Sequence, residues 1–162
     1  RFSLAPGLAL IFSASALFHA APPRPATGPY VDAVSYLPAE VVGAWYNLIW
    51  KLKDNFDDVC GDTFCEGEFS NIEALRYACS VNQTTGRIGM CAWTFAASNE
   101  EVDPATGAID VQKGYWQCRT PLAANTTIEE LLIALTGQRP IYAPLPASGH
   151  TIMEGLVDDC FF

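Results

Sequence analysis

The sequence predicts an α+β domain in which a three-stranded antiparallel meander packs against an N-terminal helix and C-terminal helices. An apolar stripe at helical spacing over residues 38–53 predicts the first helix, and three runs of strand character between residues 75 and 119 predict the sheet. Helix-capping patterns at Thr127 and Thr151 predict the C-terminal helices. The domain is expected to cover residues 37–162 and to be linked internally by disulfides.

Residues 1–21 are predicted to be a secretory signal peptide. Arg1 precedes an almost wholly apolar stretch over residues 4–17, and residues 14–16 provide a small-x-small cleavage site. An uncleaved anchor is the alternative, but Pro6 and several polar residues interrupt a stretch already short of the roughly 20 residues that a membrane span needs. We therefore expect no stable membrane span after cleavage, and a periplasmic or secreted protein.

Residues 22–36 begin with three prolines in four positions and are predicted to form an extended tether. The helix that follows is predicted from Pro38 to Lys53, because proline suits a first helical turn and lysines suit the negative end of the helix dipole. Its apolar stripe consists of Val41, Trp45, Leu48, Ile49 and Leu52. Such a stripe is typical of a helix packed on a core.

The three strand-like runs alternate apolar and polar residues and are separated by turn residues. They cover residues 75–82, 88–97 and 109–119. A first turn centred on Thr85 predicts the pairs Cys79–Cys91, Tyr77–Trp93 and Leu75–Phe95. A second turn centred between Pro104 and Ala105 predicts the pairs Cys91–Cys118, Trp93–Trp116 and Phe95–Gly114. Both registers place cysteines and aromatic residues on one face, which we expect to be buried.

Two capping boxes predict the remaining helices. Thr127 with Glu130 precedes an apolar segment that ends near Gly137, and Thr151 with Glu154 precedes a short segment toward Cys160.

All six cysteines lie beyond the predicted signal, and their even number predicts three disulfides and no free thiol. They are Cys60, Cys65, Cys79, Cys91, Cys118 and Cys160. Cys79 and Cys118 lie on the outer strands of the meander, about 9–10 Å apart, and cannot bond to each other. At least one sheet cysteine must therefore bond to Cys60, Cys65 or Cys160. Zinc binding is disfavoured, because no second ligand pair matches Cys60 and Cys65.

The chain is acidic, with a formal charge of −9, and seven of its eighteen acids lie within residues 54–73 without any lysine or arginine. Such a charge repels phosphate backbones and excludes nucleic acid as a partner, whereas it attracts a basic protein or a divalent cation. We interpret residues 54–71 as an acidic loop that binds such a partner, through Asp57, Asp58, Asp62, Glu66 and Glu68. A merely solvated acidic surface is the plainer alternative.

Metal and catalytic sites are weakly indicated. An EF-hand register starting at Asp62 places Phe64 at a ligand position, which excludes that motif but leaves an irregular cation site in the loop. Glu66 and Glu68 would lie about 6.6–6.8 Å apart on an extended segment, a spacing compatible with glycoside hydrolysis. His150 is the only histidine beyond the signal. We therefore predict no catalytic residue, no metal ligand and no cofactor.

The segment Cys60-Gly61-Asp62-Thr63-Phe64-Cys65-Glu66-Gly67-Glu68-Phe69 resembles one found in uncharacterised exported proteins of Gram-negative bacteria. In those proteins a CGDT-aromatic-CEG block precedes cysteine-bearing strands, and the likeness extends here from Trp45 to Cys160. The resemblance implies a bacterial periplasmic or secreted setting. No activity or functional residue follows from it.

Three functions remain open on this basis. The first is a non-enzymatic binding protein of the bacterial envelope, such as an inhibitor or immunity-like module, that engages a basic protein through the acidic loop. The second is a small hydrolase that acts on envelope glycans with Glu66 or Glu68 and Asp62. The third is a domain with a structural cation in the loop.

Overall fold

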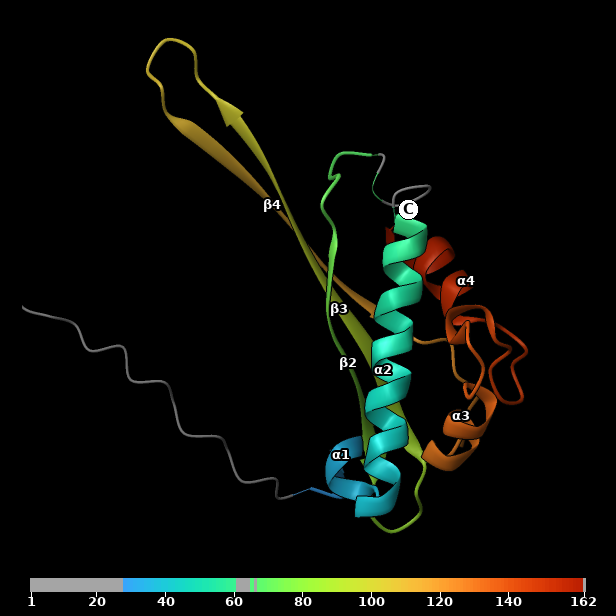
Figure 1. Cartoon of the computed structure of the whole chain (residues 1–162). Helices are drawn as coiled ribbons and strands as arrows, with labels where there is room; N and C mark the ends of the chain where they lie inside the picture. The colour runs from blue at the N-terminus through green and yellow to red at the C-terminus, as the bar shows by residue number, and fades with distance from the viewer. Residues whose placement is uncertain (1–27, 61–64, 66, 162) are drawn as a thin grey trace, which may run out of the picture.

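The computed structural model of the chain describes residues 28–60, 65 and 67–161, and it confirms the α+β class. The sheet has four antiparallel strands in the order β1-β2-β3-β4, one more than the meander predicted from sequence. Helices α2, α3 and α4 lie on one side of it (Figure 1). The signal-peptide prediction for residues 1–21 falls outside the described residues.

The additional strand comes from the segment predicted to be a tether. β1 (Tyr30–Asp32) pairs with Ser80–Asn82 at the edge of the sheet, and α1 (Ala33–Tyr36) follows at once. Asp32 starts this helix, because its carboxylate accepts the Val34 N–H at 3.0 Å. The prediction of an extended tether is thus wrong for residues 30–36.

Helix α2 (Ala39–Cys60) ends seven residues beyond Lys53, where the predicted helix ended. Residues 54–60, assigned from sequence to the acidic loop, are its last two turns. The helix continues because Phe56 and Val59 extend the apolar stripe onto the sheet, and both are buried. Local charge suggested a loop there, but core packing determines the structure.

The first hairpin joins β2 (Glu73–Asn82) to β3 (Ile88–Val102). The predicted pairs Cys79–Cys91 and Tyr77–Trp93 are confirmed. The predicted pair Leu75–Phe95 is wrong, because a bulge between Ala74 and Arg76 places Ala74 opposite Phe95 and leaves Leu75 exposed.

The second hairpin joins β3 to β4 (Ile109–Arg119), and its register differs from the prediction by two residues. Trp93 pairs with Cys118, and Phe95 pairs with Trp116. The connection is longer on its C-terminal side than predicted, since Asp103 accepts the Ala105 and Thr106 N–H groups and Gly107 adopts a φ of 70°. A two-residue shift preserves side-chain orientation, so the predicted face is unchanged.

That face is the core of the protein. Phe56 of α2 packs 4.7 Å from Phe95 and 5.8 Å from Trp93, measured between ring centroids. Tyr77 is buried, with its hydroxyl 3.0 Å from the Thr120 hydroxyl, and burial raises its pKa to about 12. The prediction of a buried aromatic face is confirmed for Tyr77 and Trp93.

The C-terminal elements are α3 (Ile128–Ala134), the 3-10 turn η2 (Pro140–Tyr142), α4 (Ile152–Leu156) and the π-helical turn η3 (Val157–Phe161). Both predicted capping boxes are present, at Thr127 with Glu130 and at Thr151 with Glu154. None of the helices in the described ranges is long and apolar enough to cross a membrane.

Three disulfides link the elements, and no cysteine is free. The bonds are Cys60–Cys65, Cys79–Cys91 and Cys118–Cys160. As predicted, one bond lies within the sheet and one sheet cysteine bonds outside it. The third disulfide ties η3, near the last described residue, to β4.

The distal halves of β3 and β4 project beyond the helices as a two-stranded arm (Figure 1). We call residues 98–113 the arm; its strands pair from Ser98–Lys113 to Val102–Ile109. The sheet face opposite the helices is called the open face, and it carries Arg76, Ala78, Met90 and Ala92.

Candidate functional site

The acidic residues predicted to bind a partner do not share one loop. Asp57 and Asp58 are exposed in the last turns of α2, and Glu68 is exposed in a bend after the helix. Asp62 and Glu66 lie outside the described residues. The geometry of the predicted Glu66–Glu68 pair and of the loop cation site therefore stays a prediction.

The described acids do not gather into a metal site: no group of three or more histidine, cysteine, aspartate or glutamate residues among them is placed to hold an ion. Asp57 lies 3.9 Å from Lys53, which also contacts Glu73. Partial loss of hydration raises the pKa of the Asp57 carboxyl, and Lys53 offsets this only in part. The end of α2 is thus a crowded anionic surface with one lysine in it.

His150 and the adjacent acids Glu100 and Glu101 lie in open solvent. His150 Nδ1 is 3.4 Å from the Glu154 carboxylate, which already caps α4 by accepting the Thr151 N–H at 2.7 Å. Glu100 and Glu101 are consecutive residues of a strand and point to opposite sides of the arm. Neither pair encloses a space in which a substrate would be held.

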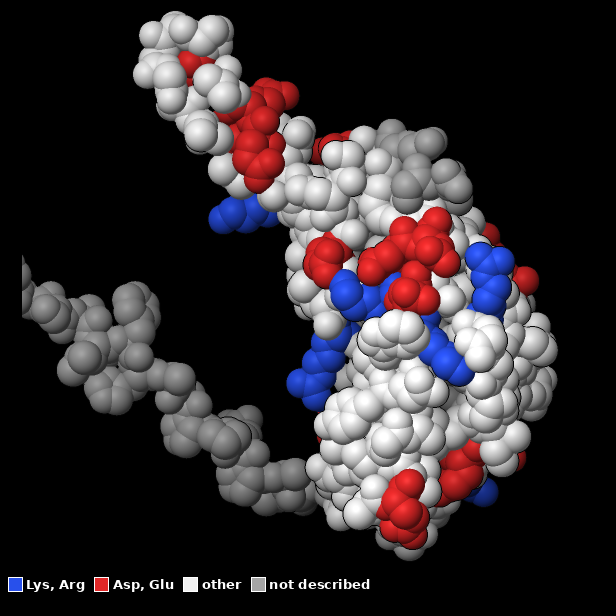
Figure 2. Space-filling model, in the orientation of Figure 1, with Lys and Arg blue, Asp and Glu red and all other residues white. Residues whose placement is uncertain are grey.

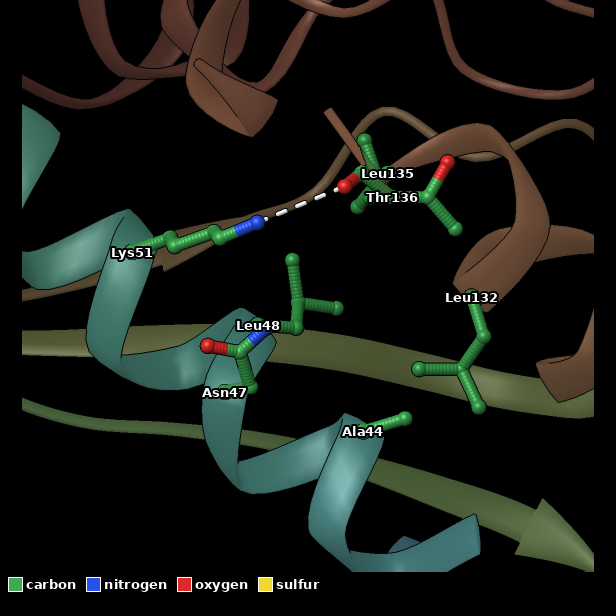
Figure 3. Close-up of a pocket in the computed structure, with 7 residues that line it drawn as sticks. All are labelled: Ala44, Asn47, Leu48, Lys51, Leu132, Leu135 and Thr136. Atoms are coloured by element: carbon green, nitrogen blue, oxygen red, sulfur yellow. Dashed lines mark hydrogen bonds between the residues drawn. The ribbon is translucent and has the colours of Figure 1, made fainter. Parts of the chain in front are cut away.

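A small hollow of about 90 Å³ lies between α2 and α3 (Figure 3). Lys51 closes it by donating hydrogen bonds from Nζ to the carbonyls of Thr136, at 3.4 Å, and Gly137, at 3.0 Å. A lysine in this position compensates the carbonyls that end α3. We assign this hollow to helix packing and not to ligand binding.

The outer surface of α2 differs from that of an ordinary solvated helix. Tyr46 and Trp50 lie one turn apart on it, with 55% and 62% of their surface exposed. Asp54 follows one turn later on the same side, and Asp57 and Asp58 follow in the next turn. Figure 2 shows acidic side chains grouped on this front surface, above a broad uncharged area.

Beside these aromatic residues a hollow of about 370 Å³ opens between α2 and β2. Its rim includes Tyr46 and the bulged Leu75, which is 56% exposed. At one end Arg76 pairs with Asp32 at 2.8 Å. The other lining residues are mostly apolar, namely Val34, Trp45, Ile49 and Tyr77.

We call this region the α2–β2 surface. It comprises the hollow bordered by Tyr46 and Leu75, the exposed Trp50 one turn from Tyr46, and the neighbouring acids Asp54, Asp57 and Asp58. It combines an apolar depression, two exposed aromatic side chains and a negative border. Chemically it offers no nucleophile or base, but it offers the contacts that a protein or peptide ligand uses.

Comparison with protein-family models, curated proteins and solved structures finds no match. The function is therefore argued from this geometry alone.

The acidic residues of this surface are predictable from the sequence, whereas its exposed apolar residues were not predicted. A signal was present, because Tyr46 and Trp50 are large aromatic residues that fall outside the stripe packed on the core. Leu75 gave no such signal. Its exposure depends on the bulge in β2, and regular alternation predicts it to be buried.

Proposed function

We propose that this chain is an exported, non-enzymatic binding protein that engages a basic protein partner through the α2–β2 surface. The observation that carries the proposal is the exposure of Tyr46 and Leu75 at the rim of one apolar hollow, with exposed Trp50 one helical turn from Tyr46. Single exposed apolar residues are ordinary, but three large ones at or beside a depression are typical of an interaction site.

Aromatic residues are the commonest energetic centres of protein interfaces. Trp50 and Tyr46 provide large contact areas on a rigid helix, so little conformational entropy is lost when a partner covers them. The hollow beside them has room for one apolar side chain of the partner. These features support a ligand that inserts such a side chain and lies along α2.

The acids at the end of α2 define the charge of that ligand. Asp54 and Asp58 are exposed beside Asp57, and Lys53 is already engaged by Asp57 and Glu73. Loss of hydration is the main cause that raises the pKa of Asp57, and neighbouring acids add to it, so basic residues of a partner would favour its charged form. They would also speed association, because complementary charge steers encounter.

The proposed setting is the bacterial periplasm or the extracellular space. Three disulfides in a chain with an apolar N-terminal stretch support an oxidising compartment. A small, covalently linked domain that binds a basic protein there would act as an inhibitor or an immunity-like module. The negative charges of Asp62, Glu66 and Glu68 would attract the same basic partner.

The proposal is tested by selecting ligands from a library of displayed peptides, using protein purified from a bacterial periplasm. We expect the selected peptides to share one large apolar residue and at least two lysine or arginine residues. Trp50→Ala should weaken their binding by about 30-fold or more, the loss typical of an interface centre. Ile133→Ala removes an equally exposed apolar side chain on α3 and is the matched control.

The charges are tested separately. Replacing Asp54, Asp57 and Asp58 with asparagine should slow association by roughly tenfold at low salt and remove most of the salt dependence. Replacing Asp62, Glu66 and Glu68 with their amides should act in the same direction. Peptides without basic residues, or binding unaffected by Trp50→Ala, would contradict the proposal.

A further inference from the structure

We infer that a second copy of this chain covers the open face, with the arm of each copy lying across the sheet of the other. The inference concerns the face opposite the α2–β2 surface and does not depend on the function proposed for that surface. It rests on the orientation of apolar residues in the arm, the charge distribution along the open face and the length of the arm.

Apolar residues change sides between the body of the sheet and the arm. In the body, Trp93 and Phe95 of β3 point toward the helices and are buried. In the arm, Glu101 continues on that side, whereas Val102 lies on the open face. On β4 the paired residue Ile109 also lies on the open face, followed by Val111 and Tyr115.

These four large apolar side chains are exposed, with 66% of Val102, 63% of Ile109, 45% of Val111 and 65% of Tyr115 accessible. An isolated two-stranded ribbon is only marginally stable, because it has no core of its own. An arm that turns its apolar side away from the body is therefore built to pack on another surface.

The open face of the body offers such a surface. A hollow of about 430 Å³ lies over β1, β2 and β3, and its apolar lining includes Tyr30, Ala78, Met90 and Ala92. Tyr30 and Met90 remain 49% and 37% exposed. The tip of a second arm, with Val102 and Ile109, matches this lining in chemistry.

The charges of the open face are divided in the same way. Residues 99–112 contain four acids and no lysine or arginine. Glu100 lies on the open face, because it is paired with Val111, whereas Glu101 and Asp110 are paired on the opposite side and Asp103 lies in the turn. Closer to the body, Lys113 and Arg119 are exposed on the open face, whereas the charge of Arg76 is paired with that of Asp32 at 2.8 Å. The open face thus carries Glu100 near the arm tip and Arg119 next to Ala92 of the hollow.

When two copies meet head to tail, Glu100 at the arm tip of one copy approaches the Arg119 end of the other, so the open face is complementary to itself. Ala92 and Val102 are ten residues apart on β3, so the arm tip reaches about 33 Å from the hollow. A two-fold axis near Ala96 and Ser98 then places each tip on the hollow of the other copy. Each contact is made twice, as in every two-fold dimer.

The test uses two charge-reversed variants of the full protein. Arg119→Glu should be monomeric, because it meets the acidic tip of the second copy with a negative charge. The variant Glu100→Arg should be monomeric for the opposite reason. Mixed together, the two variants should form a dimer, since both tip-to-body contacts then join opposite charges.

Mass is measured by sedimentation over a roughly hundredfold range of concentration, for which the wild type should move from monomer to dimer. Trp50→Ala should dimerise like the wild type, which separates this interface from the α2–β2 surface. Far-ultraviolet circular dichroism verifies that each variant is folded. A wild type that stays monomeric throughout, or that forms larger assemblies, would overturn the inference. So would folded variants that remain monomers when mixed.

Discussion

Helix α2 carries aromatic residues on two faces. Those on the inner face pack in the core, and those on the outer face are exposed. On the inner face Trp45 is 1% exposed and packs 5.9 Å from Tyr77, whereas on the outer face Trp50 is 62% exposed. Tyr46 and Trp50 lie outside the core. Some large apolar residues of this chain therefore stabilise the fold, and others form an exposed surface.

The sheet shows the same division along its length. In the body, β3 and β4 carry Phe95 and Trp116 against Phe161, with ring centroids 5.0 and 5.4 Å from it. In the arm the same strands carry their apolar side chains on the open face. Interior residues should therefore control stability, and exterior ones should control association.

The two tryptophans of α2 provide the largest expected contrast. Trp45→Ala should lower the free energy of unfolding by about 3–5 kcal/mol, because it leaves a cavity against the sheet. Trp50→Ala should change it by less than about 0.5 kcal/mol. Denaturant titrations of both variants measure the difference. A large loss for Trp50→Ala would show that the outer face is part of the core.

The three disulfides should rank by the length of chain that they close. Replacing both cysteines with alanine should cost about 4 kcal/mol for Cys118–Cys160, which spans 42 residues. The cost should be about 3 kcal/mol for Cys79–Cys91, which spans 12, and about 2 kcal/mol for Cys60–Cys65, which spans 5. The measurement is denaturant unfolding under oxidising conditions.

If removing Cys60–Cys65 cost the most stability and removing Cys118–Cys160 the least, the ranking by chain length would be contradicted. Cys60–Cys65 lies where α2 ends, next to the acidic segment, and we expect it to order that segment more than to stabilise the domain. Thiol titration of the denatured, unreduced wild type should find no reactive thiol.

Shortening the arm should have a smaller effect on stability. Residues 99–112 are replaced by Asn-Gly, which closes a tight hairpin between Ser98 and Lys113. The free energy of unfolding should change by less than about 1 kcal/mol, since the removed residues bury little surface. Dimer formation should be lost, as measured by sedimentation. A shortened protein that dimerises normally would place the interface elsewhere.

The smallest expected effects concern two aspartates whose pKa values shift in opposite directions. Hydrogen bonds from the N–H groups of Ala105 and Thr106 lower the pKa of Asp103 below its ordinary value of 3.8, while loss of hydration raises that of Asp57 above the same value. The charged form of Asp103 therefore stabilises the fold, and the charged form of Asp57 opposes it.

Melting temperatures of Asp103→Asn and Asp57→Asn, measured from neutral to acidic pH, test these signs. At neutral pH Asp103→Asn should melt below the wild type, and this difference should disappear as the pH falls through the lowered pKa. Asp57→Asn should melt above the wild type, and its advantage should disappear as the pH falls through the raised pKa toward 3.8. Equal shifts of the same sign would contradict the assignment.

Much of the fold was predictable because local rules and burial agreed. The Cys79–Cys91 and Tyr77–Trp93 pairs follow from a turn and strict alternation, and each capping box needs only a threonine and a glutamate three residues apart. The second register was wrong by two residues, since turn length decides register and alternation decides only the face.

The rest depended on tertiary contacts. Residues 54–60 have the composition of a loop but are held in α2 by Phe56 and Val59 against the sheet. β1 has only three residues, and its pairing with β2 is too short to leave a periodic signal. The binding surface was half predictable: charge is visible in sequence, but the exposure of Leu75 is decided by a bulge.

The most direct test of the account uses the indole groups of the four tryptophans as probes in one nuclear magnetic resonance spectrum. A basic peptide from the library selection is titrated into nitrogen-15-labelled protein. The account predicts that the Trp50 resonance shifts most, that Trp45 at the base of the hollow shifts less, and that buried Trp93 stays in place. A peptide that binds without moving the Trp50 resonance would contradict the central claim that the outer face of α2 is the recognition surface.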